Sequence, residues 1–316
     1  MHRELKLANL LVLLVAIFLL SIQSALAQST ETTAKPADKS PHKSGFVTAN
    51  GIRLHYLDWG GTGSVLLLLT GLGDDAHVFD DFAPKFTDRF HVIALTRRGF
   101  GESDKPATGY DIATRVEDIR QFLDALKIER VNIAGHSAAG DEMTTFASLY
   151  PQRVNKLVYL DAAYTRARVP ELILGDPVSE PEDRRLVLEV QNSPDAAKVV
   201  VKEMPPANVW EINKAMLRAT IAFRPDYTKV KALALAFYAT PEHHPYASPQ
   251  ADEATRRKWD EWWVKNSVPY IRANIEQFRR EAPRGQIVEM KDATHYVFRG
   301  RTADELVRQT REFLLK

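Results

Sequence analysis

The chain of 316 residues contains no cysteine. This absence excludes disulfide bonds, thiolate nucleophiles and metal sites ligated by cysteine. It also excludes a lipid anchor attached to an N-terminal cysteine. The chain also lacks an excess of positive or negative charge, because its formal net charge is +1. It therefore has no strong electrostatic field to attract nucleic acid or another charged polymer. We expect a small-molecule substrate and no nucleic-acid partner.

The first 27 residues follow the pattern of a secretory signal peptide. A short basic start precedes an apolar run over residues 7–20, and Ala25-Leu26-Ala27 offers the small residues of a cleavage site. The apolar run is shorter than the ~20 residues that a spanning helix needs, which favours cleavage over retention as a membrane anchor. The pattern predicts an exported protein, periplasmic or secreted, with signal peptide 1–27 and no stable membrane span after cleavage.

Residues 28–44 have the composition of a tether. They are rich in Ser, Thr, Lys, Pro and Ala and show no apolar periodicity. Such a segment cannot bury enough apolar surface to fold, so we expect a disordered linker. Apolar periodicity begins at Gly45, and we assign residues 45–316 to one folded domain.

Short apolar runs recur along this domain and alternate with helical stretches. Continuous runs of this length are typical of strands buried on both faces of a parallel sheet. Their alternation with helices predicts an α/β fold with a doubly wound, mostly parallel sheet. Asn50-Gly51, between two further strand patterns, predicts a hairpin that adds antiparallel strands at one edge. The runs lie at 64–70, 91–95, 130–134, 156–160, 232–238 and 286–290.

The alternation of short apolar runs and helical stretches stops between about residues 162 and 229. Seven prolines divide this segment into short pieces, and proline ends helices and strands alike. We expect an insertion that forms a small helical cap over one end of the sheet.

Ser137 lies in the sequence Gly135-His136-Ser137-Ala138-Ala139, between a buried strand and a helix with an apolar face. This context is typical of a nucleophile elbow, a sharp strand-to-helix turn that exposes a serine hydroxyl. Small residues are needed two positions before and after the serine, because strand and helix pack closely there. Gly135 meets the first need and Ala139 the second. The pattern predicts Ser137 as a nucleophile.

On these residues the chain resembles the α/β-hydrolase superfamily, from about Phe46 to Lys316. Three further segments match in the expected order. Thr70–Asp74 stands where the family places its oxyanion loop, although Thr70 departs from the histidine often found there. Arg97–Ser103 resembles the family's arginine-glycine loop, and Asp292–Tyr296 stands where the family keeps its catalytic histidine.

The resemblance assigns roles to individual residues. His295 would take the proton of Ser137, because an imidazole titrates near neutrality. The backbone N–H groups of Leu72 and Ala138 would form the oxyanion hole.

The third catalytic residue would be an acid between serine and histidine in chain order, and two positions satisfy this. Glu242 follows the strand at 232–238, at the usual family site. Asp161 ends the strand at 156–160, a site that some members use instead. Family order favours Glu242 slightly over Asp161.

These residues predict a serine hydrolase that cleaves a small ester or related acyl substrate, with no cofactor or metal implied. Epoxide hydrolases and haloalkane dehalogenases share the fold but attack with a carboxylate at the elbow, which Ser137 argues against. Aminopeptidase, lactonase, thioesterase and carbon–carbon hydrolase activities use the same triad and stay open. Rival hypotheses are a non-catalytic ligand-binding member of the fold and an exported partner-binding domain.

Overall fold

A computed structural model describes residues 40–192, 209–248, 250–291 and 293–316. The predicted signal peptide 1–27 and most of the predicted linker lie outside the described residues. Within the described ranges, no helix is long and apolar enough to cross a membrane. The first strand begins at Lys43, so the end of the predicted linker 28–44 is corrected: pairing with the next strand orders its last two residues.

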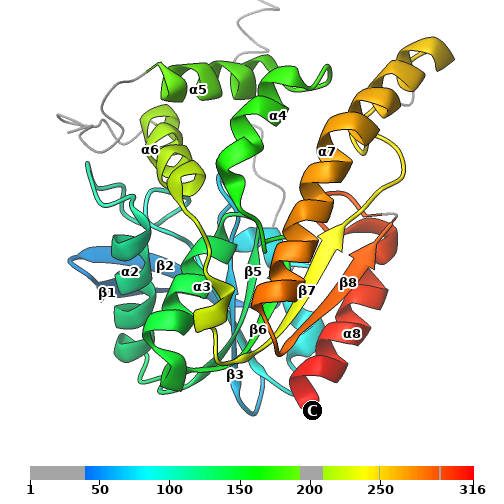
Figure 1. Cartoon of the computed structure of the whole chain (residues 1–316). Coiled ribbons are helices and arrows are strands. Elements are labelled where there is room, and N and C mark those ends of the chain that lie inside the picture. The colour runs from blue at the N-terminus through cyan, green and yellow to red at the C-terminus, as the bar shows by residue number, and fades with distance from the viewer. Residues whose placement is uncertain (1–39, 193–208, 249, 292) are drawn as a thin grey trace, which may run out of the picture. The chain divides into compact units, whose positions relative to one another are not determined.

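Residues 41–316 form one unit, whose centre is an eight-stranded sheet in the order β1-β2-β4-β3-β5-β6-β7-β8. The first two strands pair antiparallel with each other, β2 pairs antiparallel with β4, and the others pair in parallel. The predicted mixed, mostly parallel sheet is therefore confirmed (Figure 1). The strands are β1 (Lys43–Ala49), β2 (Ile52–Gly60), β3 (Val65–Leu69), β4 (His91–Leu95), β5 (Val131–His136), β6 (Val154–Leu160), β7 (Leu233–Ala239) and β8 (Gly285–Met290).

Helices pack on both faces of this sheet. Alternate residues of β3 show why: Leu67 and Leu69 join one apolar cluster, with α2, α3 and α7, whereas Leu66 and Leu68 join a second cluster with η1, η2 and α8. Side-chain acceptors fix helix starts, as where Asp111 accepts from the N–H of Thr114. The helices on the sheet are α2 (Ile112–Ala125), α3 (Ala139–Leu149), α7 (Glu253–Glu281) and α8 (Ala303–Leu315), and the short ones are η1 (Ala76–Phe79), η2 (Ala83–Phe86), η3 (Pro151–Arg153), η4 (Arg166–Arg168), η5 (Tyr227–Lys229) and η6 (Gly300–Thr302).

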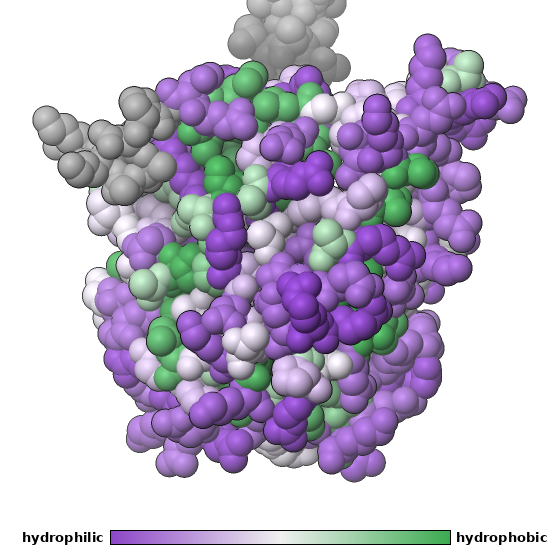
Figure 2. Space-filling view, viewed as in Figure 1, coloured by the Kyte–Doolittle hydropathy of each residue, from purple (hydrophilic) through white to green (hydrophobic). Residues whose placement is uncertain are grey.

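Three helices stand between β6 and β7, within the segment expected to form a cap: α4 (Val169–Gly175), α5 (Pro181–Gln191) and α6 (Val209–Ala222). Figure 1 shows them beyond the carboxyl ends of the parallel strands. Their buried contacts form a small apolar cluster of their own, made by Leu186, Val187 and Val190 of α5 with Leu217 of α6. Apolar residues also reach the surface of this region, Leu188 among them, in a surface that is otherwise largely hydrophilic (Figure 2). The insertion is thus a packed helical layer at the edge of the sheet where parallel strands present their loops.

Candidate active site

Ser137 occupies a strained turn between β5 and α3. Its φ of 53° lies in the left-handed region, which costs a non-glycine residue about 1–3 kcal/mol. Tight packing holds the turn. A Cβ at Gly140 would lie 1.9 Å from the carbonyl oxygen of Ala162, which leaves no room for a side chain. A Cβ at Gly135 would lie 2.6 Å from Met143 Sδ and 3.0 Å from the Cβ of Ala139. Glycine at 135 therefore leaves the space that the methyl group of Ala139 borders.

A chain of hydrogen bonds joins the elbow serine to an acid through a histidine. His295 Nε2 lies 2.8 Å from Ser137 Oγ, and His295 Nδ1 lies 2.7 Å from Asp161 Oδ2. Both the serine and the histidine are half-buried, and the histidine follows β8 on the loop before α8. Sequence reasoning placed Ser137 and His295 in one site, and the structure brings them into contact.

The acid in contact with this histidine is Asp161, not Glu242. Asp161 ends β6 with a φ of 51°, is buried, and also accepts hydrogen bonds at Oδ1 from the N–H of Ala239 (2.9 Å) and the hydroxyl of Tyr164 (2.7 Å). The slight preference for Glu242 is corrected: its side chain is 72% exposed and lies 3.8 Å from Lys291 Nζ. The turn after β7 directs it to solvent, whereas the turn after β6 directs the aspartate to the histidine.

Leu72 and Ala138, the expected oxyanion donors, both line a cavity with Ser137. Within the described residues, neither backbone N–H donates a hydrogen bond to another protein group. The N–H of Ala138 precedes the first turn of α3, where helix N–H groups have no intrahelical acceptor. Both N–H groups are therefore free of protein acceptors in the described part of the chain, and both residues border the cavity that Ser137 lines.

Arg97 supports the loop that carries Leu72. Its guanidinium donates to the carbonyl oxygens of Thr70 and Gly71, each at 2.8 Å, and forms a bidentate pair with Glu142 of α3. Arg115 of α2 donates to the same carboxylate at 2.5 Å. Burial opposes ionisation of Glu142, but the two arginines hold its pKa below the ordinary value. Through this buried network, Arg97 links the loop that carries Leu72 to α3, the helix that follows Ser137. The arginine of the Arg97–Ser103 loop thereby has a structural role near the site.

Arg166, on η4 of the insertion, also holds the turn at Ser137 in place. Its guanidinium donates to the carbonyl oxygens of Ser137 (2.5 Å) and Ala162 (3.0 Å), and it pairs with the buried Asp141 of α3. It thereby ties the serine turn to the segment that follows Asp161. Sequence reasoning missed this residue, and no local pattern marks it, because its partners come from distant segments.

His136, next to Ser137 in the chain, supports His295. Its Nε2 lies 3.1 Å from the carbonyl oxygen of His295, and the two rings are 4.6 Å apart. Burial lowers the pKa of His136 to about 4, so the ring is neutral at pH 7 and donates from Nε2. The ring of His136 also lies 4.7 Å from that of Tyr296, whose hydroxyl donates to Asp74. The histidine loop is therefore held at its backbone as well as at its ring.

A cavity of about 820 Å³ opens on the serine and histidine between the sheet and the insertion. Its lining combines aliphatic side chains of α4–α6 with aromatic side chains of α7 and the β6–α4 connection. The latter include Tyr164 and Tyr270, whose rings are stacked. Apolar lining residues include Leu172, Ile173, Leu186, Val187, Leu217, Trp262 and Trp263. Volume and lining suit a small, largely apolar ligand.

Comparisons with known proteins agree with this architecture. The family model described as alpha/beta hydrolase fold matches residues 64–188. An uncharacterised protein of Mycobacterium tuberculosis is 37% identical over 125 residues, 40% of this chain and 36% of that protein. A soluble epoxide hydrolase of a Corynebacterium species is 35% identical over 112 residues, 35% of this chain and 39% of that enzyme. The chain thus spans less than half the length of these relatives.

Similarity in structure extends further along the chain. A crystal structure of E-2-(acetamidomethylene)succinate hydrolase covers 87% of this chain and 100% of its own, with a TM-score of 0.59 and 20% identity. At that identity the likeness concerns the fold alone. Residues 64–188 match the family model described as alpha/beta hydrolase fold, and the sheet order and the strand-to-helix turn at Ser137 show that the chain has this fold.

Proposed function

We propose that this protein is a serine hydrolase that cleaves a small carboxylic ester, or a related acyl substrate, through an acyl-serine intermediate. The hydrogen-bonded series from Ser137 Oγ through His295 to Asp161 carries this proposal. A serine hydroxyl is a weak nucleophile until a base removes its proton, and the imidazole lies within direct reach of that proton.

Acylation follows from this arrangement. His295 Nε2 accepts the Ser137 proton while Oγ attacks the carbonyl carbon of the substrate, and Asp161 stabilises the imidazolium at Nδ1. The negative oxygen of the tetrahedral intermediate is placed against the N–H groups of Leu72 and Ala138. The intermediate collapses as the imidazolium gives its proton to the leaving alcohol, whose bond to the acyl carbon breaks.

Deacylation repeats these steps with water. His295 removes a proton from water, the resulting hydroxide attacks the acyl carbon, and Ser137 leaves with the proton returned from Nε2. The acid is released and the enzyme returns to its starting state. A serine in this position favours acyl transfer over the carboxylate attack that opens epoxides. The apolar cavity of about 820 Å³ supports a small acyl group as the part of the substrate held in the enzyme.

A fluorophosphonate probe tests the nucleophile, and a panel of p-nitrophenyl esters with acyl chains of increasing length tests the substrate class. We expect one covalent adduct on Ser137 and turnover that falls for long chains. Ser137→Ala should lose both, whereas Ser148→Ala, a serine on α3 that bonds within its own helix, should retain both. Unchanged turnover in Ser137→Ala would exclude the proposal. Lactones, thioesters and amides in the same panel separate the other acyl substrates.

We also propose that the protein is exported, on the strength of the signal-peptide pattern in residues 1–27. Expression of the full chain in a Gram-negative host, followed by cell fractionation and N-terminal sequencing, tests this. We expect a periplasmic form that begins near Gln28. An intact N-terminus in the cytosolic fraction would contradict it.

A further inference from the structure

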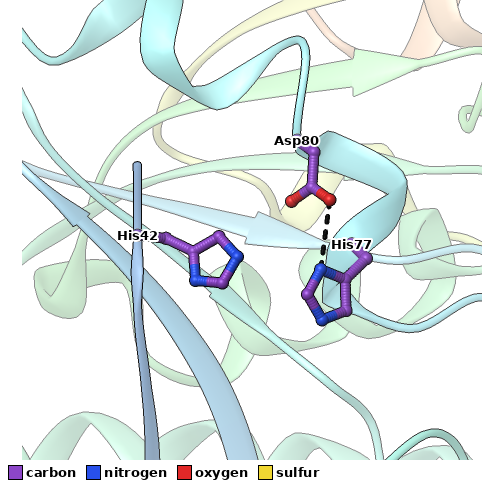
Figure 3. Close-up of side chains that lie close together, drawn as sticks. All are labelled: His42, His77 and Asp80. Atoms are coloured by element: carbon purple, nitrogen blue, oxygen red, sulfur yellow. Dashed lines mark hydrogen bonds and ion pairs between the residues drawn. The ribbon is translucent and has the colours of Figure 1, made fainter. Parts of the chain in front are cut away.

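Two histidines and an aspartate converge on the β1–η1 side of the molecule, away from the lining of the active-site cavity. His42 immediately precedes β1, His77 lies on η1, and Asp80 follows it by three residues. One potential ligand atom from each lies within 4.8 Å of the others, and all three side chains are partly buried. Figure 3 shows the two imidazole rings directed toward one another with the carboxylate beside them.

The surrounding structure holds this constellation in place. Asp75 accepts a hydrogen bond from the N–H of His77 at 3.0 Å, which fixes the start of η1. Asp80 Oδ2 lies 3.1 Å from His77 Nδ1. On the other side, the ring of His42 packs edge-on against Trp59 of β2, with ring centres 5.5 Å apart. Ligand side chains that are already oriented lose little freedom when a metal binds.

From this geometry we propose that His42, His77 and Asp80 form a site for a divalent transition-metal ion, with zinc as the best fit. Two imidazole nitrogens and one carboxylate oxygen are a donor set that zinc accepts, whereas Mg²⁺ and Ca²⁺ favour oxygen donors throughout. Tetrahedral zinc, with bonds of ~2.0–2.1 Å, sets neighbouring donor atoms about 3.3 Å apart. The His77–Asp80 pair, at 3.1 Å, already has nearly this spacing, and the three donor atoms all lie within 4.8 Å of one another.

Bound metal would join two parts of the fold that the chain connects only through β1, β2 and β3. His42 marks the entry to the sheet, and η1 follows directly on the loop that carries Leu72 and Asp74. Three protein ligands leave a fourth position for water. Since none of the three residues lines the active-site cavity, the ion would tie the N-terminal entry to the oxyanion loop and would not act on substrate. The proposal that this site binds metal does not depend on the proposed function. Only the statement that the ion supports an oxyanion loop rests on that function.

The test is zinc binding by the untagged protein purified without metal, measured by competition with a fluorescent zinc indicator and by metal analysis after dialysis. We expect one Zn²⁺ per chain and a higher unfolding temperature with Zn²⁺ present. His42→Ala and His77→Ala should each weaken binding at least tenfold and abolish the thermal shift. Circular dichroism checks that each variant is folded, and Asp80→Asn gives a near-isosteric third variant.

His91→Ala is the matched control, because His91 also pairs with an aspartate, Asp58, at 2.8 Å, but among the described residues this pair is not part of a group of three potential metal ligands. It should bind zinc as the unaltered chain does. Absence of stoichiometric zinc in the unaltered chain, or equal affinity in the His42→Ala/His77→Ala double variant, would overturn the proposal. Equal affinity for Mg²⁺ would overturn the choice of a transition metal. A chain that binds zinc but hydrolyses no ester would refute the proposed function and leave this site standing.

Discussion

Replacing Asp161 by asparagine separates the two acids that the sequence leaves in competition. The amide has nearly the same volume, and its oxygen can still accept from Ala239 N–H and the Tyr164 hydroxyl. Its NH₂ group, however, would face His295 Nδ1, where Oδ2 now lies at 2.7 Å. An NH₂ donor favours the tautomer whose proton is on Nε2, and that nitrogen can no longer accept the proton of Ser137.

Loss of the correct tautomer in an analogous serine–histidine–aspartate triad lowers kcat about 10⁴-fold. We expect Asp161→Asn to lower kcat on a p-nitrophenyl ester about 10³- to 10⁴-fold, which corresponds to about 4–5.5 kcal/mol in the activation barrier. KM should change little, because the carboxylate stabilises the imidazolium of the transition state and does not hold the acyl group.

Glu242→Gln is the matched control. Its carboxylate is 72% exposed and 3.8 Å from Lys291, so the change should leave kcat within about twofold, since an exposed pair of this kind contributes little. Steady-state rates would be measured for both variants, with circular dichroism to confirm folding. A loss of less than tenfold in Asp161→Asn, or an equal loss in Glu242→Gln, would refute the assignment.

The other predictions concern packing and buried charge. Gly140→Ala should destabilise the fold by about 1–3 kcal/mol and abolish ester turnover, because its Cβ would lie 1.9 Å from the Ala162 carbonyl oxygen. Gly175→Ala on α4, where the nearest contact of an added Cβ is 3.5 Å, is the control. Equal effects of the two variants in urea unfolding would contradict the packing argument. Arg166→Met should lower the free energy of unfolding by about 3–5 kcal/mol, because it leaves the buried Asp141 without its partner. The double variant Arg166→Met/Asp141→Leu should recover most of this loss. No recovery would mean that the hydrogen bonds of Arg166 to the carbonyl groups of Ser137 and Ala162 dominate. His136 has a folded-state pKa of about 4 against an ordinary 6.5, so the unfolded chain takes up a proton first, and stability should fall as pH drops from 6.5 to 4, by up to about 3 kcal/mol. His136→Gln should flatten this part of the urea-unfolding pH profile, and an unchanged slope would show that other groups cause it.

Much of the fold follows from local sequence. The apolar run at 91–95 predicts β4, because a strand buried on both faces admits few polar side chains. The run at 286–290 predicts β8 to within a residue, although Gln286 and Glu289 of this edge strand are exposed. The elbow serine was predictable for a similar reason, since a strand, a small-residue turn and a helix must follow one another along the chain. His295 was predictable from its place after the last strand.

Sequence order alone could not choose the acid. The strands that end near Asp161 and Glu242 are neighbours in the sheet, β6 and β7, so both residues reach the edge that carries Ser137. The direction of each turn decided the matter, and that direction depends on contacts such as the bond from Ala239 N–H to Asp161.

By itself, the sequence determined the α/β class and indicated Ser137 and His295 as the proposed nucleophile and base, because each of these predictions depends on residues close together in the chain. Only the tertiary structure decided that Asp161, and not Glu242, contacts His295. It also decided that Arg97 and Arg166 bond to the segments around Ser137, and that His42 lies beside His77 and Asp80. Each of these contacts joins side chains from separate segments, and their distances are set by how the strands and helices pack.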